Sequence, residues 1–179
     1  YEYDLELLND PSAHGTRIIA SREVLKRCYY LAFTAQIEQS TVYSNRLWLE
    51  LEAAINLPHW NPWHWLETAE LMHAAAISYD WCYDFWTVEQ KTAIKNAIAE
   101  KGLGEAVREY AGNRRWYQWV YGMTGYEMGN NWNIVCNTGV LMGALAIANE
   151  EPALCSTMIN NAVRSIRNGL NAYVPDGGY

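Results

Sequence analysis

The chain has 179 residues, a formal net charge of −7 and apolar residues at half of its positions. This length suits one domain, and a charged fraction of only 18% excludes a disordered or solvating segment. The acidic balance argues against sequence-independent binding to nucleic acid and against adhesion to anionic membranes, which both need a basic surface. The chain has 9 tryptophans and 13 tyrosines but only 2 phenylalanines. Tryptophan and tyrosine suit partly solvated surfaces, because their apolar rings carry a polar group.

Hydrophobic periodicity predicts helices along most of the chain. A first helix is expected over residues 22–39, with Ser21 as its N-cap. A second is expected over residues 43–56, and Pro58 stops it because proline cannot continue a helix. The loop that follows, His59-Trp-Asn-Pro-Trp-His-Trp65, is dense in aromatic rings.

A third helix is expected over residues 66–83. Thr87-Val-Glu-Gln90 has the spacing of a capping box and predicts the start of a fourth helix, which Gly102 is expected to end. Further helices are expected over residues 104–119, 131–149 and 152–172. No segment shows the alternation that is typical of a strand, so the fold class is predicted to be all-α.

Charge divides these helices into two kinds. Residues 130–149 and 71–79 carry no charged side chain, whereas the helices at 89–101 and 153–167 do. A helix without a charged face is normally buried on all sides, so inner and outer helices are expected to alternate. This pattern predicts helical hairpins in an incomplete (α/α) toroid, with a plain helix bundle as the alternative. No membrane span is predicted, because the longest apolar run is too short.

Two features of composition concern packing. Cys28, Cys82, Cys136 and Cys155 are widely spaced within apolar stretches, which predicts buried free thiols, although disulfides stay open for a secreted protein. Gly139 and Gly143, together with neighbouring alanines, make one side of the sixth helix slim. That side is expected to permit close approach of another helix.

The segment Tyr126-Glu-Met-Gly-Asn-Asn-Trp-Asn-Ile-Val-Cys-Asn-Thr-Gly139 is rich in asparagine. Asn130, Asn133 and Asn137 are spaced to share one helical face, and Asn131 and Trp132 flank it. A buried amide without partners costs about 1–3 kcal/mol, so the stripe needs a purpose. One interpretation is that these amides cap the helix and satisfy loop backbone. The other is that they line a concave pocket and donate hydrogen bonds to an anionic ligand.

The aromatic loop has two interpretations as well. Trp60, Trp63 and Trp65 can form a stacking platform for sugar rings, or the loop can simply plug the end of the helical layer. No metal site is predicted there, because His59 and His64 lack helical ligand spacing and no carboxylate completes a triad.

Several charged residues are candidates for chemistry. Asp80 and Asp84 lie one turn apart near a helix end, although anchoring a neighbouring hairpin is an ordinary role for them. Glu67 and Glu70 are favoured by the dipole of a first helical turn. The pair at Arg114 and Arg115 can grip a carboxylate or can be part of a solvated helix exterior.

Three ordered motifs resemble the heparinase II/III-like polysaccharide lyases. They are Trp65-Leu-Glu-Thr-Ala-Glu-Leu-Met-His-Ala-Ala-Ala-Ile-Ser-Tyr-Asp-Trp81, Asn130-Asn-Trp-Asn-Ile-Val-Cys-Asn-Thr-Gly139 and Pro175-Asp-Gly-Gly-Tyr179. The resemblance covers about residue 47 to the end and implies an incomplete α/α toroid over residues 1–179. In that family a β-sandwich region follows the toroid, and this chain is expected to be a toroid fragment without it.

The resemblance implies β-elimination on uronic-acid-containing acidic glycans, without a cofactor. In that family an Asn or a His neutralises the substrate carboxylate so that the neighbouring proton can leave, and a Tyr, sometimes together with a His, acts as base and acid. Asn131 matches the neutralising amide, Asn137 is a second catalytic candidate, and Tyr179 matches the Tyr. Some relatives have His directly after the Asn, where this chain has Trp132. Substrate contacts are expected from Tyr126, Glu127, Asn130, Trp132, Asn133, Trp63, His64 and Arg115.

Two other functions remain open. One is an α/α-toroid glycoside hydrolase that uses a carboxylate pair such as Asp80 with Glu127, since hydrolysis needs two carboxylates across the bond. The other is a non-catalytic helical module that binds glycans through the tryptophan loop. The expected partner is an acidic polysaccharide in each enzymatic case, and the resemblance implies a periplasmic or secreted location.

Overall fold

The computed structural model describes residues 14–112, 131–173 and 177. They form helices, and the described part of the chain contains no β-strand, so the all-α prediction is confirmed. The α-helices are α1 (His14–Glu38), α2 (Thr41–Ile55), α3 (Leu66–Trp81), α4 (Val88–Ala97), α5 (Gly104–Tyr110), α6 (Asn131–Ala146) and α7 (Pro152–Leu170). No described helix combines the length and the apolar character that a membrane span requires.

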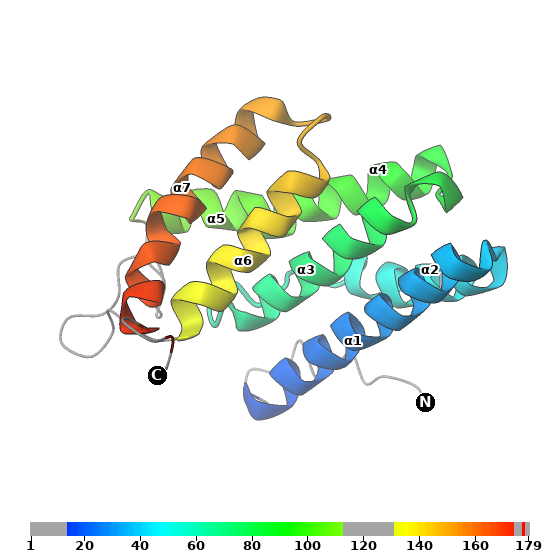
Figure 1. The fold of residues 1–179 in the computed structure, drawn as a ribbon, viewed down its shortest axis with the longest axis horizontal. Helices are drawn as coiled ribbons and strands as arrows, with labels where there is room; N and C mark the ends of the chain where they lie inside the picture. The colour runs from blue at the N-terminus through cyan, green and yellow to red at the C-terminus, as the bar shows by residue number, and fades with distance from the viewer. Residues whose placement is uncertain (1–13, 113–130, 174–176, 178–179) are drawn as a thin grey trace.

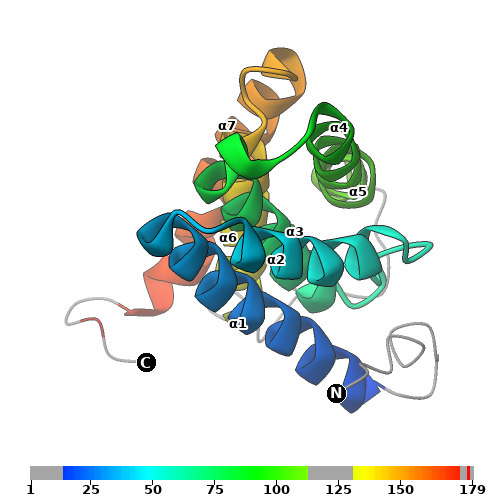
Figure 2. The same ribbon diagram turned by 90° about the vertical axis from the view of Figure 1, so that its right-hand side faces the viewer.

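Three helices lie side by side in the order α1, α3, α6 and run in the same direction (Figure 1). Helix α3 packs against α1 on one side and against α6 on the other. The chain returns between them through α2 and through the α4–α5 segment, and α7 returns along α6. Figure 2 shows α4 and α5 nearly end-on, where they overlap because the π-helical segment η3 (Ile98–Leu103) joins them into one rod. The described helices therefore form successive hairpins.

Local hydrogen bonds explain where several helices begin. The predicted capping box is confirmed, since Gln90 N donates to Thr87 Oγ1 at 3.2 Å and Thr87 N donates to Gln90 Oε1 at 3.0 Å. The predicted cap at Ser21 is wrong, because α1 already begins at His14. Ser21 is buried inside that helix, where its hydroxyl donates to the carbonyl of Ile18 at 3.0 Å.

Gly102 does not end a helix as expected. The chain continues through Gly102 in η3 and enters α5 directly. A Cβ at this position would collide with the Sδ atom of Met72 in α3. Gly102 therefore lets the rod pack closely against the Met72 side chain, and it does not form a left-handed cap.

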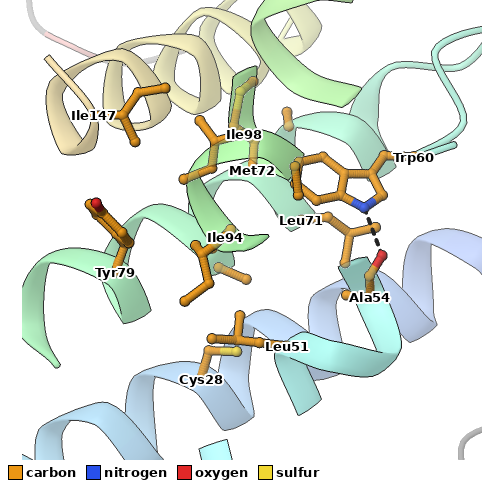
Figure 3. Packing of buried hydrophobic residues seen from close by; sticks show 14 of the residues in the cluster. Cys28, Leu51, Ala54, Trp60, Leu71, Met72, Tyr79, Ile94, Ile98 and Ile147 are labelled. Atoms are coloured by element: carbon orange, nitrogen blue, oxygen red, sulfur yellow. Dashed lines mark hydrogen bonds between the residues drawn. The ribbon is translucent and has the colours of Figure 1, made fainter. Parts of the chain in front are cut away.

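The apolar core joins all the described hairpins. Its largest fully buried side chains include Leu51 of α2, Leu71 and Met72 of α3, and Ile98 of η3. Figure 3 shows these residues with Trp60, whose indole Nε1 donates to the carbonyl of Ala54 at 2.9 Å. This bond satisfies the polar group of a buried ring, so the ring fills the core without leaving an unpaired donor.

Helices α3 and α6 approach each other closely, as the slim side of the sixth helix predicted. A Cβ on Gly139 would lie 2.8 Å from the Cα of Ala69, and one on Gly143 would lie 2.7 Å from the Cγ of Met72. A Cβ atom is essentially never found so close to a nonbonded atom. Only glycine at position 139 therefore allows the backbones of α3 and α6 to lie this close together.

The two uncharged helical segments are not both buried as expected. Residues 71–79 of α3 are buried, with the exception of the half-buried His73. Helix α6 is more open, because Asn131 is exposed at its start and Leu145 is 62% exposed near its end. The prediction that α6 is buried on all sides is therefore wrong.

The prediction of buried free thiols is confirmed for Cys28, Cys82, Cys136 and Cys155. Burial raises the pKa of Cys28 to about 12, and it raises those of Cys82 and Cys155 to about 11. Since the thiolate is the reactive form, these side chains act as small apolar groups in the core.

Candidate functional site

Two motifs that are far apart in the sequence meet at one end of the inner helices. The aromatic loop at residues 59–65 leads into α3, and the first turn of α6 lies beside it. The indole Nε1 of Trp132 donates to the backbone carbonyl of His64 at 3.0 Å. The two rings also meet edge to face, with centroids 5.0 Å apart. The structure thus brings the predicted binding residues His64 and Trp132 together.

The loop divides its three tryptophans between two roles. Trp60 and Trp65 are buried, so for these two rings the interpretation as a plug is confirmed. Trp63 is 47% exposed and has the edge of His59 against it, with centroids 4.5 Å apart. Of these three rings, Trp63 is the one with a large exposed fraction.

The backbone of the loop is strained at two positions. Asn61 has φ 54° and Trp65 has φ 70°, in a region that favours glycine. The backbone N–H groups of His64 and Trp65 both donate to the carbonyl of Asn61, at 3.2 and 3.1 Å. Such conformations cost about 1–3 kcal/mol each and persist only where packing enforces them. The buried indoles of the loop supply that packing, so His64 has a fixed position.

His64 is paired with a buried carboxylate. Its Nδ1 lies 2.6 Å from Oε2 of Glu67, in the first turn of α3. The Glu67 side chain is 0% exposed and that of His64 is 17% exposed. Oε1 of Glu67 has no hydrogen-bond partner within the described residues. The helix-dipole interpretation of Glu67 is thus incomplete, because this side chain is also bonded to the imidazole of His64.

Two further carboxyl groups, with Glu67, influence the thiol of Cys136 in α6. Burial raises the pKa of the Cys136 thiol well above its usual range, and Glu109, Glu67 and Glu70 add to that rise. Glu109 is buried, and Glu70 is paired across α1 and α3 with Nε of Arg22 at 3.3 Å. Carboxyl groups of α3 and α5 therefore lie close enough to Cys136 to disfavour its thiolate.

The asparagines separate into two groups. Asn131 is exposed at the first position of α6. Asn137 is fully buried, where its Oδ1 accepts from Tyr110 Oη at 2.7 Å and its Nδ2 donates to Asn133 O at 2.7 Å and to Ser165 Oγ at 3.1 Å. These contacts bind α6 to α5 and α7, so the predicted catalytic role of Asn137 does not fit its placement.

Asn133 lies in the same buried interface. Its Nδ2 donates to Ser165 Oγ at 3.2 Å, and its Oδ1 accepts from the backbone N–H of Gly169 at 3.1 Å. The prediction that Asn133 contacts substrate fails for the same physical reason, since α7 covers the face that the stripe occupies. Asn133 and Asn137 therefore have a structural role, but they join α6 to α5 and α7 instead of capping the helix or satisfying loop backbone.

The remaining predicted site residues lie outside the described residues. They are Tyr126, Glu127, Asn130, Arg115 and Tyr179.

Asp80 lies at the other end of α3. At about 1.5 Å per residue it is about 20 Å along the helix from Glu67. It is exposed and lines a cleft of about 200 Å³ with Ala76, Ile77, Met142, Leu145 and Ala146. This cleft and the loop at residues 59–65 are too far apart to contact the same sugar unit.

A second histidine pair, which the sequence did not indicate, lies in the middle of α3. Tyr29 Oη of α1 and His73 Nε2 of α3 are 2.6 Å apart, and Trp81 meets the Tyr29 ring edge-on with centroids 5.5 Å apart. Burial lowers the pKa of His73 and raises that of Tyr29, so both neutral forms are favoured. The partners are 44 residues apart in sequence, so no local motif could reveal the pair.

The described residues contain no group of three or more His, Cys, Asp or Glu side chains placed to hold a metal ion. No family model matches this chain, and no curated protein is similar enough to match it. Evidence for a function therefore comes from the motifs and from the contacts at the meeting point of the loop and α6.

Proposed function

We propose that the chain is the helical part of a lyase that cleaves uronic-acid-containing polysaccharides by β-elimination. The successive hairpins, with α1, α3 and α6 parallel and adjacent, support an incomplete α/α toroid. The single observation that carries the proposal is the contact between Trp132 and His64, which brings the loop at residues 59–65 beside Asn131.

The chemistry requires neutralisation of a carboxylate. The proton to be removed lies on the carbon next to the substrate carboxylate, and it becomes acidic only when the negative charge that develops there is stabilised. Asn131 is exposed and has an amide that can donate to this carboxylate. It also lies at the N-terminal end of α6, where the helix dipole favours an anion. Asn131 is accordingly the neutralising residue of the proposal.

Recognition of the sugar falls to the exposed ring in the loop. The C–H face of a pyranose packs well on an indole, and Trp63 offers such a surface. His64 and the indole of Trp132 form the adjoining wall. Tyr179, predicted as the base, belongs to the same proposal as a residue outside the described ones. Substrates of this class occur outside the cytoplasm, which supports a periplasmic or secreted location.

The test is an assay for unsaturated uronate. The full-length natural protein is incubated with a panel of acidic polysaccharides while the ultraviolet absorbance of the conjugated product is followed. We expect absorbance to rise with at least one polymer and the rise to vanish in Asn131→Ala. The matched control is Asn160→Ala, which removes an exposed asparagine from α7 and is expected to leave the rate unchanged.

Other outcomes decide between the alternatives. New reducing ends without absorbance would establish a hydrolase and reject the lyase, and loss of those ends in Glu127→Ala would implicate a carboxylate pair. Binding of the polymer without either product would support a glycan-binding module. If Asn131→Ala retained the full elimination rate, the neutralising role of Asn131 would be wrong.

A further inference from the structure

We infer that the exposed side of α1 is an interaction surface that pairs with the same side of a second copy of this chain, in an antiparallel two-fold dimer. The inference goes beyond the proposed lyase function and does not depend on it. It comes from a row of large apolar side chains on α1 that stay mostly exposed among the described residues.

The row lies on the side of α1 that faces away from the core. Ile19, Tyr30, Phe33 and Ile37 are each between 59% and 68% exposed. At about 100° per residue these four side chains lie within about 60° of one another, on the side of the helix opposite the buried Cys28. They are therefore a separate surface feature and not the border of the apolar core.

Helix α1 lies at the edge of the layer that it forms with α3 and α6 (Figures 1 and 2). It packs against α2 and α3, yet neither helix covers the row, since its members keep more than half of their surface exposed. Monomeric proteins rarely expose a continuous apolar patch of this kind, and such patches commonly mark interaction sites.

The spacing of the row fits a helix as its partner. Ile19, Lys26 and Phe33 follow one another at intervals of seven residues, and Tyr30 and Ile37 form a second series with the same interval. Two interleaved series of this kind are the contact positions of a coiled coil. We call these five residues, Ile19, Lys26, Tyr30, Phe33 and Ile37, the α1 stripe.

The α1 stripe is complementary to itself when two copies run antiparallel. With the two-fold axis at the level of Cys28, Ile19 faces Ile37 of the second copy and Lys26 faces Tyr30 of the second copy. Each contact occurs twice by symmetry. An ammonium group over a tyrosine ring is favourable, and this chain already has one such pair, with Lys91 Nζ 3.8 Å from the centroid of the Tyr83 ring.

The remaining position of the α1 stripe also fits this register. Phe33 faces Glu23 of the second copy, whose carboxylate is held on its own helix by Lys26 and Arg27. The ring can then pack on the apolar part of the Glu23 side chain. A parallel pairing in register would instead place Lys26 against Lys26 of the second copy, and like charges oppose such a contact.

The surface is large enough for a weak dimer. Side chains of this size and exposure supply about 500 Å² from each copy, or about 1,000 Å² in total, which is close to the lower limit for specific interfaces. The net charge of −7 on each copy opposes association. We therefore expect a dissociation constant in the micromolar range.

The first experiment is sedimentation equilibrium of the full-length natural protein from about 1 to 200 µM. We expect a monomer–dimer equilibrium and at least about a tenfold rise in the dissociation constant for Phe33→Asp. The matched control is Leu49→Asp, which places the same charge at a side chain of α2 that is 57% exposed. It is expected to change the dissociation constant less than about threefold.

A charge exchange tests the register. Tyr30→Lys places two ammonium groups together at the contact between positions 26 and 30, so we expect at least about a tenfold weaker dimer. Adding Lys26→Tyr to that variant exchanges the ring and the ammonium group between the two helices and is expected to restore dimerisation. The antiparallel register predicts this rescue, whereas a parallel pairing does not.

Disulfide cross-linking gives an independent measurement. A mixture of Ile19→Cys and Ile37→Cys proteins is expected to form a linked dimer on mild oxidation. Each variant alone is expected to stay unlinked, because identical positions are about 27 Å apart along the antiparallel pair. The four native cysteines are buried and do not compete.

Several outcomes would overturn the inference. One is a monomer at every concentration, and another is a dimer that Phe33→Asp leaves intact, since its contact would lie elsewhere. A monomer that Phe33→Asp strongly destabilises would mean that another part of the same chain covers the α1 stripe. Cross-linking of a single variant with itself, or failure of the Lys26→Tyr rescue, would reject the antiparallel register. The elimination assay is independent of all these results, so the lyase proposal stands or falls separately.

Discussion

The start and the middle of α6 use the same residue type for opposite purposes. Asn131 is exposed where α6 meets the aromatic loop, whereas Asn137 is buried and bonded to Tyr110, Asn133 and Ser165. The two side chains point about 120° apart around the helix, given about 100° per residue. The exposed amide of Asn131 can therefore bind a ligand, whereas the buried amide of Asn137 bonds α6 to α5 and α7.

The two histidines of this region show the same division. His64 pairs with a buried carboxylate at the open end, and His73 pairs with the phenol of Tyr29 in the seam between α1 and α3. Both hydrogen bonds are 2.6 Å long. The first pair lies beside the start of α6, whereas the second lies between two packed helices. Function is expected at the open end and stability along the seam, and substitutions in each region test that division.

The largest effect on stability is expected from Gly139→Ala, at the contact between α3 and α6. The new Cβ would lie 2.8 Å from both the Cα and the carbonyl oxygen of Ala69, so the backbones of α3 and α6 must separate. We expect a loss of about 3 kcal/mol in the free energy of unfolding, measured by urea denaturation, despite the better helix propensity of alanine.

Gly143→Ala is the matched control for that substitution. Its Cβ would meet Met72, a flexible side chain that can move, instead of backbone atoms. We expect less than half the loss that Gly139→Ala causes. Equal losses in both variants would show that the α3–α6 contact is not limited by the backbone at Ala69.

A smaller effect is expected from Asn137→Ala. The substitution leaves the hydroxyl groups of Tyr110 and Ser165 without one of their buried partners, which costs about 2 kcal/mol. Asn131→Ala at the open end is expected to change stability by less than about 0.5 kcal/mol. Thermal and urea unfolding of the two variants measure the difference. A destabilised Asn131→Ala with an unaffected Asn137→Ala would reverse the assignment of the two amides.

Much of the fold was predictable from local signals. Periodicity located the helices, the spacing from Thr87 to Gln90 predicted a capping box, and Gly139 predicted close helix contact. The predictions at Ser21 and Gly102 were wrong because residues typical of helix ends also occur inside helices. Ser21 bonds the carbonyl of Ile18 in its own helix, and Gly102 packs against Met72.

The candidate site was predictable only in part. The aromatic loop and the asparagine-rich helix start were both identified, yet which amides face solvent depends on α7, whose position no local pattern encodes. The pairing of His64 with Glu67 has a weak signal in its three-residue spacing at a helix start. The pairing of Tyr29 with His73 has none, since it depends on how α1 packs on α3.

The smallest expected effect is a change in acid sensitivity at His73. Burial lowers the pKa of His73 in the native state, so the unfolded chain takes up a proton first, near the ordinary value of about 6.5. Stability is therefore full above that pH and falls as the pH drops through 6.5 toward the lower native pKa. His73→Gln removes this titration and keeps an acceptor for the hydroxyl of Tyr29.

Urea denaturation at pH 8 and at pH 5 measures the effect. Between these values the wild type is expected to lose more stability than His73→Gln, by up to about 1.4 kcal/mol for each unit by which the native pKa is lowered. The other titratable groups are the same in both proteins, so their contributions cancel in the comparison. Equal losses would mean that His73 takes up its proton as easily in the native state as in the unfolded chain, and the seam would then not be the water-poor region that distinguishes it from the open end.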